Sequence, residues 1–172
     1  TSTAIKTRGF WLGTNLITAL IAASVINIFK ETLEEVIFLA VLMPIIASMG
    51  GVAATQTLTI TVRGLALGQI VKANYKYIFN RELIVGITNG FLWAIVLSLI
   101  ACLWFQDWTL IWVISLSMII NLLAGILSGM GIPILLRSLK MDPAVAGSVI
   151  VTTVTDVVGF FSFLGFASYF YS

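Results

Sequence analysis

The sequence contains no histidine and a single cysteine, Cys102. Without histidine, Ser–His and Cys–His catalysis and histidine metal sites are excluded, and one cysteine can form neither an internal disulfide nor a cysteine zinc site. Charge is also scarce, since 9% of the residues are charged, whereas a soluble domain carries about 25%. These absences argue against an ordinary soluble domain and against a site specialised for zinc or copper.

Long hydrophobic runs take the place of charge, and 60% of the residues are hydrophobic. Five stretches are each long enough for a membrane helix of about 20 residues and lack the period-two alternation of a β-barrel. They cover about Phe10–Phe29, Val36–Val62, Leu83–Phe105, Leu110–Leu136 and Ala144–Tyr171. The sequence therefore predicts an all-α integral membrane protein with five transmembrane helices in a lipid bilayer. The connection from Arg63 to Glu82 is predicted to form a short interfacial helix.

Basic residues are distributed unevenly between the connections. If the N-terminus lies in the cytoplasm, the inner side receives eight of the nine basic residues and the outer side only Lys30. Those eight are Lys6, Arg8, Arg63, Lys72, Lys76, Arg81, Arg137 and Lys140. By the positive-inside rule, we predict a multi-pass protein of the inner (plasma) membrane with a cytoplasmic N-terminus and an extracytoplasmic C-terminus. The chain begins at Thr1 without Met and shows no cleavable signal peptide, so we expect it to be part of a longer protein.

Asp156 is the most unusual residue, because the segment from Pro143 to Tyr171 contains no other charge. A carboxylate at mid-bilayer depth costs at least ~2.5–3.5 kcal/mol and is tolerated in a bundle interior or an aqueous path. We interpret Asp156 as an ion site. The alternative is a protonated or internally hydrogen-bonded aspartate that only holds helices together. As the single carboxylate expected within the membrane, it cannot form an aspartyl dyad, and we predict no enzymatic activity.

Polar and small residues surround Asp156 on a helical wheel. Thr152, Ser148, Gly159 and Thr153 all lie within about 80° of it. The hydroxyls could hold the waters of a cation, and Gly159 would remove bulk beside the carboxylate. Alternatively, these hydroxyls bond to carbonyls of their own helix or pack against a neighbour. An all-oxygen site suits Mg²⁺, which keeps several waters and therefore needs a wide path, but Mn²⁺, Ca²⁺ and Co²⁺ also fit.

The second stretch combines helix breakers with polar residues: Pro44, Gly50, Gly51, Thr55 and Gln56. A break here would expose carbonyls to protein or water, as in a pore lining. The alternative is a simple kink with tight packing. Two further small-residue patterns, Gly86-x-x-x-Gly90 and Gly125-x-x-x-Gly129, could join helices within one subunit or between two.

Together, these motifs resemble the MgtE family of magnesium channels. The resemblance rests on Pro44 with Gly50-Gly51, Thr55-Gln56 and Arg63-Gly64-Leu65-Ala66, and on Asp142-Pro143-Ala144 followed by Thr152-Thr153-Val154-Thr155-Asp156-Val157-Val158-Gly159-Phe160. It covers nearly the whole chain, so residues 1–172 are expected to be the five-helix membrane domain of that family. Val52 and Ala54 depart from the pattern, since relatives often have Asn and Gly there.

The resemblance implies a homodimer with its pore on the subunit interface, lined by the second and fifth helices. It also implies that Asp156 of both subunits selects Mg²⁺, the transported ion, and that cytoplasmic magnesium-sensing domains, including a CBS pair, belong to the full-length chain. Three functions remain open: a Mg²⁺ channel into the cytoplasm, a secondary transporter that exchanges Mg²⁺ for Na⁺ or H⁺, and a non-transporting assembly or receptor subunit. We expect no nucleic-acid partner.

Overall fold

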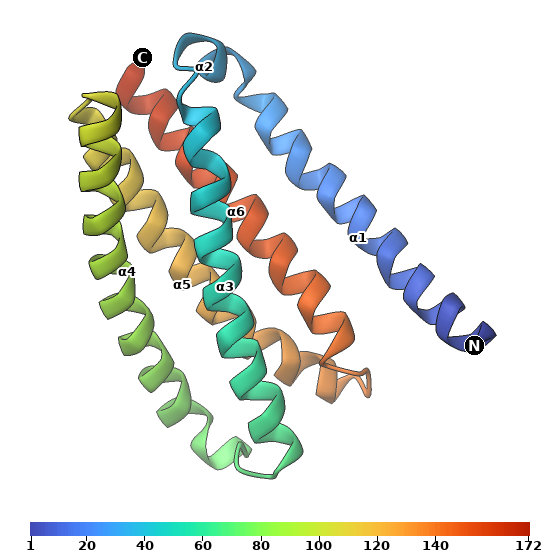
Figure 1. Cartoon of the computed structure of the whole chain (residues 1–172). Coiled ribbons are helices and arrows are strands. Elements are labelled where there is room, and N and C mark those ends of the chain that lie inside the picture. The colour runs from blue at the N-terminus through green and yellow to red at the C-terminus, as the bar shows by residue number, and fades with distance from the viewer.

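The computed structural model describes all 172 residues and consists of helices and their connections (Figure 1). The elements are α1 (Ser2–Ile28), α2 (Lys30–Glu35), α3 (Leu39–Ala66), the 3₁₀ turn η1 (Lys72–Asn74), α4 (Tyr75–Phe105), α5 (Thr109–Ser138) and α6 (Val145–Tyr171). Five of the helices are long and apolar enough to cross a membrane. The prediction of an all-helical chain with five helices of membrane-spanning length is therefore confirmed.

The two ends of the bundle differ in charge. The N-terminus lies at one end and the C-terminus at the other, because the five long helices alternate in direction (Figure 1). The α3–α4 and α5–α6 connections share the end of the N-terminus, which carries most of the basic residues. The short helix α2, with Glu31 and Glu34, shares the other end with Asp107. Which end faces the cytoplasm stays a prediction from this charge pattern.

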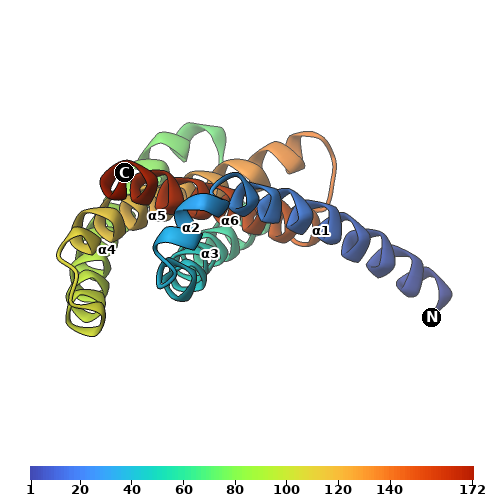
Figure 2. The ribbon, with the colours of Figure 1, turned by 90° about the horizontal axis from the view of Figure 1, so that it is seen from above.

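Helix α5 is the centre of the bundle and packs against α3, α4 and α6, whereas α1 packs on α6 and projects away from the rest (Figures 1 and 2). Glycines allow the close contacts of α5. A Cβ on Gly125 would lie 2.8 Å from the carbonyl oxygen of Gly50, and one on Gly129 would lie 2.7 Å from that of Ala54. On α4, Gly90 packs against α5 as well. Both glycine pairs thus join helices within one subunit.

The connection between α3 and α4 differs from its prediction, because it contains no interfacial α-helix. Helix α3 ends in a tight turn in which Gly68 adopts a φ of +69°. The N–H of Gln69 donates to the carbonyl oxygen of Gly64 at 2.9 Å and the N–H of Gly68 to that of Leu65 at 3.2 Å, the pattern of a Schellman-type helix end. Helix α4 then begins at Tyr75, so residues expected at the membrane surface form its first two turns.

The expected break in the second span is also absent, because α3 is continuous through Pro44, Gly50 and Gly51. Pro44 lies in the second turn of the helix, where it removes the hydrogen bond to the carbonyl of Ala40 and leaves the others intact. Gly50 is buried and Gly51 partly buried. The alternative of tight packing therefore describes this segment better than a broken helix.

Candidate functional site

Asp156 lies in the middle of α6, where this helix meets α3. The preceding residue, Thr155, is fully buried, and its Oγ1 lies 3.8 Å from the position of a Cβ on Gly51. Asp156 itself is partly buried and lies beside the exposed residue Thr152 of the same helix. Its carboxylate has no hydrogen-bonding or ionic partner within the chain. The alternative of an internally hydrogen-bonded aspartate is therefore not seen within one subunit.

The hydroxyls predicted beside Asp156 continue along α6 toward the basic end of the bundle. Thr152 and Ser148 are exposed and Thr153 is partly buried. Each hydroxyl donates to its own helix: Thr152 to Ser148 O at 2.7 Å, Ser148 to Val145 O at 2.9 Å, and Thr153 to Val149 O at 2.7 Å. Since a hydroxyl has one donor and two acceptor positions, this bonding leaves oxygen lone pairs free to accept hydrogen bonds from water.

Helix α3 places a matching row of hydroxyls beside α6. Thr55 is exposed, one turn from Gly51 toward the basic end, and donates to Gly51 O at 2.8 Å. Thr59 follows one turn later and donates to Thr55 O at 2.8 Å, while Ser48 lies on the other side of Gly51. Sequence reasoning missed Ser48 and Thr59, although their spacing of seven and four residues from Thr55 is a helical signal.

The two rows form one open polar face. Helix α6 packs against α3 and α1 and runs between them in Figure 1. Thr152 and Thr55 are exposed. Ser148 is exposed as well, but it lines a crevice of about 730 Å³ with Arg8 and Asn15 of α1. Polar groups at this depth normally face a bundle interior or a water-filled cavity rather than lipid. The open face therefore requires water, a second protein surface, or both.

Two predicted residues lie away from this face. Gly159 is buried, and a Cβ there would lie 2.8 Å from Nδ2 of Asn121 in α5, so the glycine serves packing and does not open space beside Asp156. Gln56 lines a crevice of about 370 Å³ between α3 and α4, together with Asn89 and Glu82. The predicted set is therefore divided between the open face, the packed core and this crevice.

Glu82 is a buried carboxylate of α4, although the prediction placed it in the connection before the third span. Its exposed fraction is 6%, and its Oε1 lies 3.1 Å from Nη2 of Arg81. The third span was predicted to begin at Leu83, whereas α4 begins at Tyr75, so Glu82 lies inside the helix. A signal was present, since Glu82 lies four residues before Gly86 and eight before Gly90, on the side of α4 that packs against α5.

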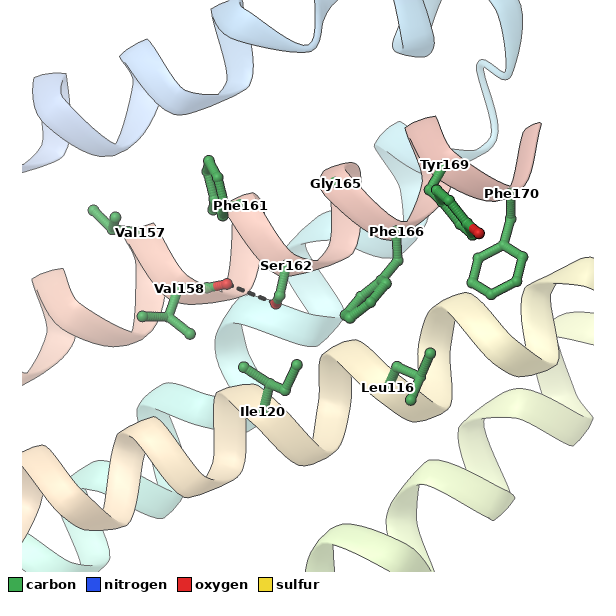
Figure 3. Close-up of a pocket in the computed structure, with 10 residues that line it drawn as sticks. All are labelled: Leu116, Ile120, Val157, Val158, Phe161, Ser162, Gly165, Phe166, Tyr169 and Phe170. Carbon is green, nitrogen blue, oxygen red and sulfur yellow. Dashed lines mark hydrogen bonds between the residues drawn. The ribbon is translucent and has the colours of Figure 1, made fainter. Parts of the chain in front are cut away.

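A groove of about 640 Å³ between α5 and α6 has a different character (Figure 3). Its lining is mainly apolar and includes Leu116, Phe161 and Phe166. The hydroxyl of Ser162 donates to Val158 O at 2.6 Å, as the dashed line in Figure 3 shows. Because no carboxylate lines this groove, it suits hydrocarbon and not a cation.

Comparison with known proteins gives a consistent result. The family model MgtE, described as a divalent cation transporter, matches residues 43–166. A protein named magnesium transporter MgtE from Bacillus subtilis (strain 168) is 32% identical over 160 residues, which are 93% of this chain and 36% of the relative. Proteins of the same name from Enterococcus faecalis and Thermus thermophilus are each 29% identical, over 93% and 91% of the chain. The chain spans about a third of the length of these relatives.

Proposed function

The chain belongs to the MgtE family of divalent cation transporters, and we propose that it forms the membrane pore through which Mg²⁺ enters the cytoplasm. The observation that carries this proposal is the carboxylate of Asp156, which has no partner within the chain and lies on the open face with the hydroxyls of α3 and α6. Residues 1–172 would be the transmembrane domain of a longer protein.

The open face supports a homodimer as the working unit. A two-fold axis along this face would place each copy opposite the same face of its partner, as in an isologous interface. The polar rows would then line a shared path instead of meeting lipid. Asp156 from both copies would supply a charge of up to −2, which balances one divalent cation.

The hydroxyl geometry fits a cation that keeps its water shell. Mg²⁺ releases its waters reluctantly and usually keeps several of them. These waters donate hydrogen bonds, and the hydroxyls of Ser148, Thr152 and Thr55 have free acceptor positions because their protons are used within the helix. We therefore propose that Asp156 selects the hydrated ion by charge and that the hydroxyls bind its waters.

A channel is favoured over a secondary transporter by the continuity of α3. Transporters commonly build their ion sites from discontinuous helices with unwound backbone. Helix α3 crosses Pro44, Gly50 and Gly51 without a break, and Pro44 removes only the hydrogen bond to the carbonyl of Ala40. Single-channel recording tests this point, because discrete current steps require a channel and exchange for Na⁺ or H⁺ requires a carrier.

The segment that matches this chain is about a third of the length of the relatives. We propose that the full-length protein also contains cytoplasmic magnesium-sensing domains that regulate the pore. The basic end of the bundle would be the cytoplasmic side that connects to them, in agreement with the positive-inside rule.

The decisive experiment replaces the charge of Asp156 and measures Mg²⁺ flux into liposomes. At an effective dielectric constant of ~20, a carboxylate ~4 Å from a unit charge contributes about 4 kcal/mol, and a hydrated ion further away gains less. Even ~2 kcal/mol corresponds to a roughly 30-fold loss of site occupancy. Asp156→Asn should therefore fold and dimerise but lose flux and Mg²⁺-dependent thermal stabilisation, whereas Asp156→Glu should retain part of the flux.

A matched control is Asp142→Asn, which makes the same chemical change in an exposed connection. Asp142 Oδ1 accepts a hydrogen bond from the N–H of Ala144 at 2.9 Å, and an asparagine oxygen can accept it as well. This variant should transport like the parent. Parental Mg²⁺ flux through a folded Asp156→Asn protein would refute the proposed site.

A further inference from the structure

Asn121 is a buried amide in the middle of α5 that bonds to a different helix. Its exposed fraction is 0%, and its Nδ2 donates to the carbonyl oxygen of Ile46 in α3 at 2.8 Å. Other buried polar side chains of α5 behave differently: Ser117 donates to Val113 O at 2.6 Å and Ser128 to Ala124 O at 2.7 Å, both within α5. Asn121 therefore forms a hydrogen bond between two helices, whereas Ser117 and Ser128 form hydrogen bonds only within α5.

The amide of Asn121 also occupies the space that two glycines leave. A Cβ on Gly50 of α3 would collide with the amide, with its Oδ1 at 2.8 Å, and a Cβ on Gly159 of α6 would lie 2.8 Å from Nδ2. These glycines stand next to the open polar face, because Gly50 precedes Gly51 and Gly159 follows Asp156 by one turn. Asn121 is therefore packed between the two helices that carry this face.

Stability alone does not account for an amide at this position. Oδ1 of Asn121 is buried and has no hydrogen-bonding partner. An unsatisfied buried polar group is destabilising, and an apolar residue of similar shape is often neutral or better. The hydrogen bond to Ile46 lies in the turn that follows Pro44, one turn beyond the bond to the Ala40 carbonyl that the proline removes. It therefore ties α3 to α5 in the half of α3 that contains Gly50 and Gly51.

We propose that Asn121 is a positioning residue that fixes how α3 and α6 meet, and with it the placement of the α3 hydroxyls relative to Asp156. Its effect on ion selection rests on the proposed function, whereas its effect on helix geometry does not. Asn121 touches no ion in this proposal and acts through the carbonyl of Ile46 and through Gly50 and Gly159.

The first test measures the contact of α3 and α6 without any ion. Cysteines at Gly51 and Thr155, in a Cys102→Ala background, should form a disulfide within one subunit, because a Cβ at position 51 lies 3.8 Å from Oγ1 of Thr155. Asn121→Leu keeps the branching and the number of side-chain heavy atoms, although its methyl groups are bulkier, and it removes the donor. We expect the oxidation rate to fall about fivefold, the ratio that corresponds to one neutral hydrogen bond. Ser117→Ala is the control and should leave the rate within about twofold of the parent.

The second test examines the packing of the amide with a double substitution. Gly50→Ala should lower the thermal midpoint of the parent, because the new methyl group meets Asn121. In an Asn121→Ser background the shorter side chain leaves room, and Gly50→Ala should lower the midpoint much less. An equal loss in both backgrounds would overturn the packing part of the proposal. Asn121→Ser also replaces Asn121→Leu in the other tests if the leucine variant does not fold.

The third test separates positioning from a purely structural role by the ratio of Mg²⁺ to Ca²⁺ flux in liposomes. Asn121→Leu should change this ratio, and Ser117→Ala should not. If Asn121→Leu slows disulfide formation but leaves the ratio of Mg²⁺ to Ca²⁺ flux unchanged, Asn121 has only a structural role. If Asn121→Leu leaves the rate of disulfide formation unchanged, the proposal is overturned. If Asp156→Asn transports like the parent while Asn121→Leu still slows the disulfide, the proposed ion site fails and the positioning geometry stands.

Discussion

Gly51 and Thr155 mark the point where α3 crosses α6. The position of a Cβ on Gly51 lies 3.8 Å from Oγ1 of Thr155, which is an ordinary van der Waals distance. Asp156 follows Thr155 directly, and Thr55 lies one turn from Gly51. This single contact therefore brings the carboxylate and the hydroxyls of α3 to the same open face, although more than 80 residues of sequence separate them.

The two adjacent glycines of α3 should respond oppositely to alanine. Gly51→Ala should keep or raise thermal stability, because the new methyl group has room and alanine is favoured over glycine in a helix by about 1 kcal/mol. Gly50→Ala should destabilise by about 1–3 kcal/mol, since its methyl group would overpack the amide of Asn121. Thermal unfolding in detergent measures both. A lower midpoint for Gly51→Ala than for Gly50→Ala would contradict this packing.

The proposed dimer predicts a specific cross-link between subunits. With Cys102 replaced, a cysteine at Thr152 should form a disulfide with its counterpart in the partner under mild oxidation, because the open face would lie on the two-fold axis. A cysteine at Leu99, which is 54% exposed on α4, is the lipid-facing control and should remain monomeric on a gel. Efficient transport by a purified monomer would count against the dimer.

The predicted orientation can be tested by labelling intact cells with a membrane-impermeant thiol reagent. Glu34→Cys lies in α2 at the acidic end, and Lys76→Cys lies at the start of α4 at the basic end; both parent residues are exposed. In a Cys102→Ala background, position 34 should react from outside and position 76 only after the membrane is opened. The reverse pattern would invert the topology.

A side-chain hydrogen bond at the C-terminal end of α6 should contribute to the stability of the fold. The hydroxyl of Tyr171 donates to Asp107 Oδ2 at 2.6 Å, which ties α6 to the turn between α4 and α5. Tyr171→Phe removes this bond to a carboxylate and should cost about 1–2 kcal/mol, since the site is partly buried. Tyr169→Phe is the matched control, because Tyr169 is 75% exposed and should change stability by less than about 0.5 kcal/mol. Equal thermal midpoints for the two variants would show that the bond contributes nothing.

The hydrophobic composition of the sequence determined the class of this protein, and its hydrophobic runs determined the number of long helices. Runs of about 20 apolar residues have no stable place in water, so their number and length fix the helices whatever their neighbours are. Asp156 stood out for the same reason, because the cost of a charge in a membrane depends on depth and not on tertiary detail. The sequence did not determine whether α3 breaks at Pro44. A proline in an early turn of a helix leaves the helix continuous, and the position of Pro44 within α3 is known only from the structure.

Tertiary structure decided which side of each helix is packed. In a soluble helix the apolar stripe reveals the core, but here exposed positions such as Leu99 and Phe161 are as apolar as buried ones, so periodicity carries little information. The sequence therefore could not show that Gly159 faces the core and Thr152 the open face. Nor could it pair Asn121 with Ile46, 75 residues away, because that contact follows from how α3 and α5 pack and not from any local pattern.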